Sequence, residues 1–380
     1  MKAKIKKRKI RIGVIFGGRS AEHEVSLVSA TSIINALDKN KYDIIPIGIT
    51  PEGKWVSFPN VLRWMKEGNR LNNIPEKILL PDPAKKGLVE INKRSIRVNG
   101  KELDVVFPVL HGTFGEDGTI QGLFELTSIP YVGAGVLGSS VGMDKVMTKQ
   151  LCEHAGIPVT PYIWFLKTEF KKRSQQFIRL VEQKIGYPCF IKPANMGSSV
   201  GISKASNRKL LIKAIHIAAK YDRKILVEKS VENAREIEIS VLGNDNPAAS
   251  IPGEIISSNE FYDYDAKYVD GKSESIIPAL MKKEMVGKIK DLAVRGFKAI
   301  ECAGMARIDF LVDRRTNKIY FNEINTIPGF TSISMYPKLW EASGISFSDL
   351  LDRLITLAIE KYREKNNLQT SFKPKKEWYK

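Results

Sequence analysis

The stretch Ile10-Arg-Ile-Gly-Val-Ile-Phe16-Gly17-Gly18-Arg-Ser20-Ala-Glu22-His-Glu24 decides the fold of the first part of the chain. Residues 10–16 form an apolar, β-branched run typical of a buried strand, and the two glycines end it. Ser20 is a suitable N-cap for the helix that follows. The apolar positions of this helix include Val25, Val28 and Leu37. Similar short runs at 43–49 and 104–110 predict further strands. This order of strand, glycine loop, helix and strand favours a doubly wound α/β domain of about 130 residues.

The remainder of the chain predicts two smaller α+β domains. Dense glycine at 133–142 marks the first boundary. The central part predicts helices and strands at 144–156, 187–192, 209–220 and 224–229. The last part predicts strands at 235–242, 254–257, 305–312 and 318–325, and a helix from Ser346 or Ser348 to about Asn366. A polar and aromatic stretch at 257–275 has the length of a functional loop. We therefore expect an α/β chain with domains at 1–133, 134–228 and 229–367, followed by a basic tail at 368–380.

The charge of the chain is concentrated at its ends. The 380 residues are 43% hydrophobic and 27% charged, with a net charge of +18, and no apolar run approaches the roughly 20 residues of a membrane span. Residues 1–11 carry +7 and residues 361–380 carry +5, which leaves +6 for the other 349. A basic nucleic-acid-binding protein would spread this charge over a folded face and carry a recognition motif, which is not visible here. The composition therefore argues against a nucleic-acid partner.

The cysteines and the first strand bear on the compartment. Cys152, Cys189 and Cys302 are far apart and form no CxxC pair, so a disulfide framework is not expected and a reducing environment fits. Residues 10–16 read as a strand rather than as the apolar core of a signal peptide. We expect a cytoplasmic protein.

A lysine and a glycine- and serine-rich turn end the strand predicted at 187–192. The run is Lys192-Pro-Ala-Asn-Met-Gly197-Ser198-Ser199-Val200-Gly201. Glycines let backbone N–H groups approach a phosphate, and hydroxyls and the lysine add donors and charge. The run is not a Walker A loop, because GxxxxGK[ST] is absent. It predicts a phosphate site, with a surface turn as the alternative reading.

Oxygen-bearing side chains alternate along the last two predicted strands. Glu323 and Asn325 are two residues apart and share a face, as do Arg307 and Asp309 on the preceding strand of a predicted hairpin. Carboxylates and amides that converge on one face suit Mg²⁺, which fills its coordination sphere with substrate phosphates. The hairpin therefore predicts a magnesium site, unless it is a solvated polar face.

Three other stretches leave their roles open. Glu22 lies in a first helical turn, where the dipole favours an acid, or it receives a substrate ammonium. The Gly17-Gly18 turn resembles that of a nicotinamide dehydrogenase, but GxGxxG and its acidic ribose partner are absent. Glu228 at a strand end and the alternating Glu236 and Glu238 bind ribose hydroxyls or are edge charges. The aromatic loop 261–268 indicates a lid over a ligand.

Taken in order, seven separated runs resemble the ATP-grasp superfamily and, within it, the D-alanine–D-alanine ligase family. The runs are Gly17–Ser26, His111–Gly118, Met143–Lys145, Lys192–Gly201, Phe261–Tyr268, Arg307–Asp309 and Glu323–Thr331. The resemblance covers about residues 10 to 360. Ile327 departs from it slightly, since leucine or serine is more common there in the family. The resemblance implies a three-domain ATP-grasp architecture, with an N-terminal doubly wound domain and with the nucleotide between the central and C-terminal domains.

The activity implied by this resemblance is the ATP-dependent ligation of two D-alanines, through a D-alanyl phosphate, for peptidoglycan precursor synthesis. ATP and two Mg²⁺ ions, with Mn²⁺ as a substitute, are the implied cofactors, and a homodimer is the implied assembly. Glu22 would hold the first ammonium and form a triad with Ser198 and Tyr268. Arg307 and the Gly329 N–H would stabilise the oxyanion, and Ser334 would bind the second carboxylate. Glu22 or water-linked neighbours are candidates for the general base.

The nucleotide roles implied by the resemblance fall on the central and C-terminal parts. The implied ATP-binding residues are Lys145, Lys192, Ser199, Glu228, Lys229, Val231, Glu236, Phe261 and Lys267, and the implied metal ligands are Asp309, Glu323 and Asn325. Among the ATP-binding residues, the first two lysines would bind phosphates, Lys267 would reach the γ-phosphate, and Glu236 would bind the ribose. Glu228, Lys229 and Val231 would contact the adenine edge. Relatives that form D-alanyl-D-lactate usually carry histidine in the lid, so Tyr268 favours an amine as second nucleophile and leaves D-serine open.

Overall fold

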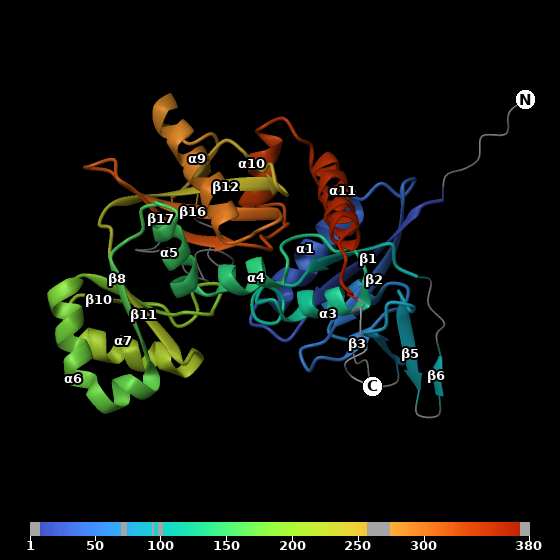
Figure 1. Cartoon of the computed structure of the whole chain (residues 1–380), viewed down its shortest axis with the longest axis horizontal. Coiled ribbons are helices and arrows are strands. Elements are labelled where there is room, and N and C mark those ends of the chain that lie inside the picture. The colour runs from blue at the N-terminus through green and yellow to red at the C-terminus, as the bar shows by residue number, and fades with distance from the viewer. Residues whose placement is uncertain (1–7, 70–73, 93–94, 98–101, 257–273, 373–380) are drawn as a thin grey trace, which may run out of the picture.

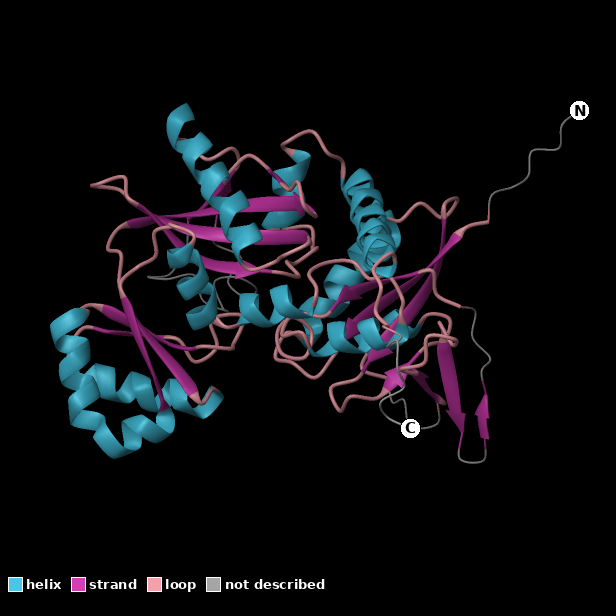
Figure 2. Cartoon of the chain, viewed as in Figure 1, coloured by secondary structure: helices cyan, strands magenta, loops and turns pink. Residues whose placement is uncertain are grey.

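The computed structural model describes residues 8–69, 74–92, 95–97, 102–256 and 274–372 and is a mixed α/β protein, as the sequence predicts. These residues form a mostly parallel N-terminal sheet, a small hairpin sheet beside it and two antiparallel sheets (Figures 1 and 2). The predicted loop at 257–275 lies outside the described residues except for its last two positions, as do most of the basic head and tail.

The N-terminal sheet has the strand order β3-β2-β1-β7. Its strands are β1 (Ile10–Gly17), β2 (Tyr42–Ile49), β3 (Trp55–Val56) and β7 (Val105–Val109), and its helices are α1 (His23–Ala36), α2 (Val61–Lys66) and α3 (Thr119–Thr127). Strand β1 runs parallel to β2 and β7, as in a doubly wound unit. The predicted cap is wrong, because α1 begins at His23 and Ser20 accepts a hydrogen bond from the Glu22 N–H before the helix starts. Val28 is also exposed, whereas Val25 and Leu37 are buried.

The segment between β2 and β7 shows little periodicity in the sequence but contains several short elements. Besides β3 and α2, these are β4 (Glu76–Leu79), β5 (Leu88–Asn92) and β6 (Ser95–Arg97). The last three strands form an antiparallel sheet at the side of the N-terminal domain. Their shortness explains why no pattern stands out, since three to five residues give at most two alternations.

The small antiparallel sheet, with the order β10-β9-β11-β8, carries two helices on one face. The strands are β8 (Tyr162–Leu166), β9 (Cys189–Pro193), β10 (Ser203–Ala205) and β11 (Lys224–Lys229), and the helices are α6 (Lys167–Lys184) and α7 (Arg208–Tyr221). In Figure 1 this unit forms a lobe at the lower left. Before it come α4 (Val136–Met143), which occupies the glycine-dense stretch, and α5 (Lys145–His154). Asp144 caps α5 by accepting the Val146 N–H at 3.0 Å.

The third sheet has the order β15-β14-β12-β16-β17, with β13 paired to β12. Its strands are β12 (Ala234–Gly243), β13 (Ala248–Ala249), β14 (Gly253–Ile256), β15 (Glu274–Ile276), β16 (Gly304–Asp313) and β17 (Ile319–Asn325). The helices that follow its strands are α9 (Lys283–Ala299), α10 (Met335–Glu341) and α11 (Phe347–Asn366). Ser346 is the N-cap of α11, which decides between the two predicted starts.

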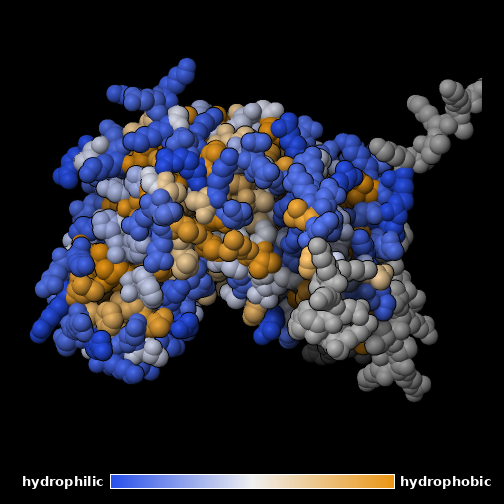
Figure 3. Space-filling view, viewed as in Figure 1, coloured by the Kyte–Doolittle hydropathy of each residue, from blue (hydrophilic) through white to orange (hydrophobic). Residues whose placement is uncertain are grey.

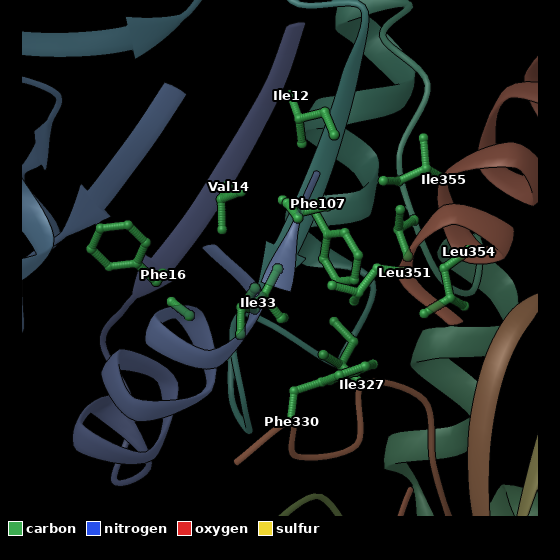
Figure 4. Packing of buried hydrophobic residues seen from close by; sticks show 14 of the residues in the cluster. Ile12, Val14, Phe16, Ile33, Phe107, Ile327, Phe330, Leu351, Leu354 and Ile355 are labelled. Atoms are coloured by element: carbon green, nitrogen blue, oxygen red, sulfur yellow. The ribbon is translucent and has the colours of Figure 1, made fainter. Parts of the chain in front are cut away.

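The N-terminal core extends into the last part of the chain. Ile327 and Phe330, from the loop after β17, pack with Phe107 and with Leu351, Leu354 and Ile355 of α11 (Figure 4). The small sheet has a separate core between its strands and α6 and α7, including Phe165, Ile191 and Leu211. Most of the visible surface is hydrophilic, with hydrophobic side chains gathered across the middle and on the lower-left lobe (Figure 3). Within the described residues, no helix is both long enough and apolar enough to cross a membrane.

Candidate active site

Two adjoining pockets lie where the three larger sheets meet. The first, of about 240 Å³, is lined by loops of the N-terminal sheet, by the turn 196–199 and by the segment 323–338. The second, of about 530 Å³, lies between the small sheet and the third sheet. Ser199, Ile202, Glu238 and Glu323 line both pockets. A ligand in one pocket therefore borders a ligand in the other.

A row of carboxylates crosses the third sheet at this border. Glu238 of β12 pairs with Asp309 of β16, and Asp309 pairs with Glu323 of β17. This register confirms the predicted hairpin and adds Glu238, whose membership of the row could not be read from the sequence. Arg307 and Asn325 form the next cross-strand pair. The pleat places alternate residues on one face, so five polar side chains converge there.

Arg307 is held by two of these carboxylates. Its guanidinium donates to Asp309 at 2.8 and 2.7 Å and lies 3.0 Å from Glu238 Oε2. Burial alone would lower the pKa of Arg307, but the charges of Asp309 and Glu238 outweigh it and raise that pKa well above its usual value. A buried, permanently charged guanidinium with a fixed orientation is suited to stabilise an oxyanion that develops beside it.

The predicted metal ligands also lie on this face. Asn325 Nδ2 is 3.3 Å from Asp309 Oδ2, and Glu323 is the cross-strand neighbour of Asp309. Two carboxylates and an amide supply the hard oxygen donors that Mg²⁺ prefers. Among the described residues, no group of three or more histidines, cysteines, aspartates and glutamates could alone hold a metal ion. The donor set fits an ion whose remaining ligands come from phosphates and water.

Two lysines meet one buried carboxylate at the edge of the second pocket. Glu228 Oε2 lies 2.8 Å from Lys149 Nζ and accepts from Thr160 Oγ1 at 2.9 Å, while Oε1 pairs with Lys192. Burial alone would raise the pKa of Glu228, but the two ammonium groups hold it well below its usual range. Burial would likewise lower the pKa of Lys192, but Glu228 and Glu323 raise it. Lys192 is therefore fixed and positively charged in the second pocket.

Lys145 reaches the first pocket from the start of α5. Its ammonium donates to the Met196 carbonyl at 2.7 Å and lies 3.7 Å from Glu323 Oε2. Lys149, one helical turn further, joins the Glu228 cluster and had no predicted role. Its spacing of four residues from Lys145 places both on one face of α5, and this spacing is the signal that could have identified it.

Glu22 connects the N-terminal loop with the glycine-serine turn. Ser198 Oγ donates a hydrogen bond to Glu22 Oε1. A Cβ atom on Gly112 or Gly197 would come within 2.5 or 2.7 Å of Glu22 Oε2, so the carboxylate needs glycine on both sides. Two of the three members of the predicted triad are thus in contact.

Two residues of the motif 111–118, for which no role is predicted from the sequence, also face the first pocket. Burial lowers the pKa of His111, whose ring contacts Ser29 Oγ and the Ile327 carbonyl, both at 3.0 Å. Burial, followed by the charge of Glu22, raises the pKa of Glu116 to about 8. Its Oε1 accepts the Gly112 N–H at 3.0 Å. Near neutral pH the protonated form of Glu116 therefore dominates.

The other predicted residues divide between the pockets. Gly329 and Ser334 line the first, and Ser199 lines both. Lys229, Val231 and Glu236 line the second. Phe261, Lys267 and Tyr268 lie outside the described residues.

A lysine-lined pocket beside carboxylates suits a polyphosphate, and the smaller pocket next to it suits amino acids. This combination is typical of an ATP-dependent ligase, which uses phosphate transfer to join two small substrates.

Comparisons with known proteins agree with this class. Residues 11–134 match the family described as D-ala D-ala ligase N-terminus, and residues 151–356 match D-ala D-ala ligase C-terminus. A D-alanine–D-alanine ligase of Caldicellulosiruptor bescii is 54% identical over 363 residues, which cover 96% of this chain and 99% of that one. Another, of Natranaerobius thermophilus, is 50% identical over 365 residues, with coverage of 96% and 99%. The chain belongs to the D-alanine–D-alanine ligase family, and the predicted resemblance is confirmed.

Solved structures show the same fold. The VanG D-Ala:D-Ser ligase of Enterococcus faecalis has a TM-score of 0.82 at 38% identity, covering 92% of this chain and 100% of that chain. The D-alanine–D-alanine ligase of Coxiella burnetii has a TM-score of 0.81 at 36% identity, covering 94% and 96%.

Proposed function

We propose that this protein joins two D-alanines to D-alanyl-D-alanine, with ATP converted to ADP and phosphate, and so supplies peptidoglycan precursor synthesis. The observation that supports this most is the border between the two pockets. There Arg307, Asp309 and Glu323 lie between a pocket for a phosphate donor and a pocket for amino acids. Such a border lets a carboxylate meet a γ-phosphate.

In this proposal the second pocket holds ATP. Lys192 binds its phosphates from the second pocket and Lys145 binds them from the adjoining first pocket, while Ser199 adds a donor from the glycine-serine turn. Glu236 binds the ribose, while Glu228, Lys229 and Val231 contact the adenine edge. Asp309, Glu323 and Asn325 hold two Mg²⁺ ions, for which Mn²⁺ can substitute. These ions, when bound, neutralise the phosphate charge that would otherwise repel a carboxylate.

The first pocket holds the two amino acids. Glu22, fixed by Ser198 and two glycines, binds the ammonium of the first D-alanine. The carboxylate of that D-alanine attacks the γ-phosphorus, the bond from this phosphorus to the bridging oxygen of ADP breaks, and ADP and D-alanyl phosphate are formed. The amine of the second D-alanine then attacks the carbonyl carbon, and phosphate leaves as the peptide bond forms. Arg307 and the Gly329 N–H stabilise the oxyanion of this step. Glu22 or water-linked neighbours take the proton of the amine.

Several broader features belong to the same proposal. The domain division at 1–133, 134–228 and 229–367 makes the nucleotide pocket an interdomain site, as in an ATP-grasp architecture. Phe261 and Lys267 bind ATP from the loop 257–275, and Tyr268 completes the triad. The protein is cytoplasmic and forms a homodimer.

The test is ADP release with ATP, Mg²⁺ and D-alanine, with L-alanine, D-lactate and D-serine as alternative substrates. D-Alanine should give the fastest turnover, and no D-alanine-dependent release would refute the proposal. Arg307→Lys should lower ligation about 100-fold while ADP affinity stays within about threefold, because the oxyanion loses a fork-shaped donor. Glu323→Gln should weaken Mg²⁺-dependent ADP binding as well. Equal ligation by Arg307→Lys and the unchanged protein would contradict the oxyanion role.

A further inference from the structure

The cations that line the first pocket differ in how they are engaged. Among its described lining residues they are Lys145, Arg307 and Lys338. Lys145 is bound to a carbonyl and lies near Glu323, and Arg307 is held by two carboxylates. The Lys338 side chain makes no hydrogen bond or ion pair with any residue that the structure describes. Its charge is therefore available to a ligand in this pocket.

Lys338 is positioned by its helix rather than by contacts of its own. Helix α10 is anchored by buried residues on its other side, including Tyr336, whose hydroxyl donates to the Val241 carbonyl at 3.2 Å, and Leu339. Ser334 precedes the helix, four residues before Lys338, so both lie on one edge of α10, a turn apart. Ser334 Oγ is itself fixed by the Thr331 N–H at 3.0 Å.

The ligands of this pocket bring carboxylates into a place already rich in acids. Glu22, Glu116, Glu238, Glu274 and Glu323 all line it. A carboxylate that leaves water for such a site needs a cation or several donors. The carboxylate of the first D-alanine reacts with ATP and lies toward the phosphate border. The carboxylate of the second D-alanine persists unchanged into the product and needs a lasting partner.

We propose that Lys338, together with Ser334, binds the carboxylate of the second amino acid and so makes a free carboxylate the requirement of that subsite. This inference rests on the proposed function. It adds a charged partner to the single hydroxyl, that of Ser334, that the family resemblance implies there. Because the subsite then recognises the α-carboxylate rather than the side chain, Lys338 selects against amides and esters of the acceptor.

The test compares Lys338→Met with the unchanged protein. Methionine keeps most of the aliphatic stem and removes the charge. The KM for the second D-alanine should rise about 10- to 100-fold, as for the loss of a charge-assisted hydrogen bond, with kcat and the KM for the first D-alanine within about threefold. Lys338→Arg should restore most of the affinity. Lys298→Met, on the exposed end of α9, is the matched control and should change neither KM.

A second measurement uses D-alaninamide as acceptor, because it has the amine without the carboxylate. The unchanged protein should prefer D-alanine over D-alaninamide by at least about tenfold in kcat/KM, and Lys338→Met should lose most of that preference. If Lys338 had a merely structural role, Lys338→Met would lower kcat/KM for both acceptors equally. No preference in the unchanged protein, or an undiminished one in Lys338→Met, would overturn this inference even where D-alanine ligation is intact. Absence of D-alanine turnover in the unchanged protein would instead overturn the proposed function.

Discussion

Glu228 is the most sharply testable residue for stability, because one carboxylate compensates two buried ammonium groups. Glu228 is 3% exposed and Lys149 is 1% exposed. In Glu228→Gln, Lys149 loses the negative charge that faces it and keeps only neutral acceptors, namely the new amide oxygen and the Thr160 hydroxyl at 3.2 Å. Removing one member of a buried ion pair typically costs about 3–5 kcal/mol, since the remaining charge stays in a low-dielectric site. We expect the free energy of unfolding to fall by that amount at pH 7.

The pH dependence of the unfolding free energy tests the role of Glu228 independently. The pKa of Glu228 is held well below its usual range, so its stabilisation is complete above its unfolded-state pKa of about 4.3 and is lost as pH falls toward the folded-state pKa. The amide of Glu228→Gln does not titrate. The difference in unfolding free energy between the two proteins should therefore be constant above about pH 5.5 and shrink steadily below about pH 5.

Urea denaturation followed by circular dichroism between pH 3.5 and 8 measures both effects. Glu232→Gln, an exposed change in the same strand connection, is the control and should cost less than about 0.5 kcal/mol. Glu228→Gln combined with Lys149→Met should recover part of the loss, because the ammonium without a carboxylate is then gone. A loss below about 1 kcal/mol at pH 7, or a difference that does not shrink in acid, would refute the reasoning.

Three further predictions concern pH and packing. Burial raises the pKa of Glu116 to about 8, so the stability of the unchanged protein should fall as pH rises from about 4.5 to 8. The stability of Glu116→Gln should fall less over this range. Parallel profiles of melting temperature against pH for the two proteins would contradict this. Burial lowers the pKa of Lys361 to about 8, so stability should rise between pH 8 and about 10, and an unchanged rise in Lys361→Met would exclude this lysine as its source. Gly112→Ala would bring a Cβ within 2.5 Å of Glu22 Oε2. The substitution should lower kcat/KM for D-alanine at least about tenfold and leave the affinity for ADP unaltered. Full activity would show that Glu22 need not be held there.

The sequence predicts the strands better than the amphipathic helices. Strands β11, β16 and β17 are short apolar runs with clear ends, and the structure confirms them. Helices α6 and α9 were not predicted, because many charged residues conceal their apolar stripes. In α9 the buried residues Ile289, Leu292, Ala293, Gly296 and Phe297 have the spacing of one helical face. This periodicity was present in the sequence and would have identified the helix.

The residues of the candidate site also differ in how far the sequence predicts them. Asp309, Glu323 and Asn325 could be predicted because residues two apart on a strand share a face. Glu238 could not be placed beside them, since its neighbourhood depends on which strand pairs with β16 about 70 residues later. The roles of His111 and Glu116 depend on burial and on the charge of Glu22, which arise only when two loops of the N-terminal sheet meet.

The burial of Ile327 and Phe330 in the N-terminal core has a mechanical consequence. The loop carrying Gly329 is anchored in the N-terminal core, while the small sheet has a core of its own. We expect the three larger sheets to move as two units, with the second pocket at the junction between the small sheet and the third sheet. We expect opening at this junction to move the glycine-serine turn, which belongs to the small sheet, away from the first pocket. Glu22 and Arg307 should keep their positions. The Ser198–Glu22 hydrogen bond has to break for this opening, so we expect its strength to affect how often substrates exchange as well as how Glu22 is held.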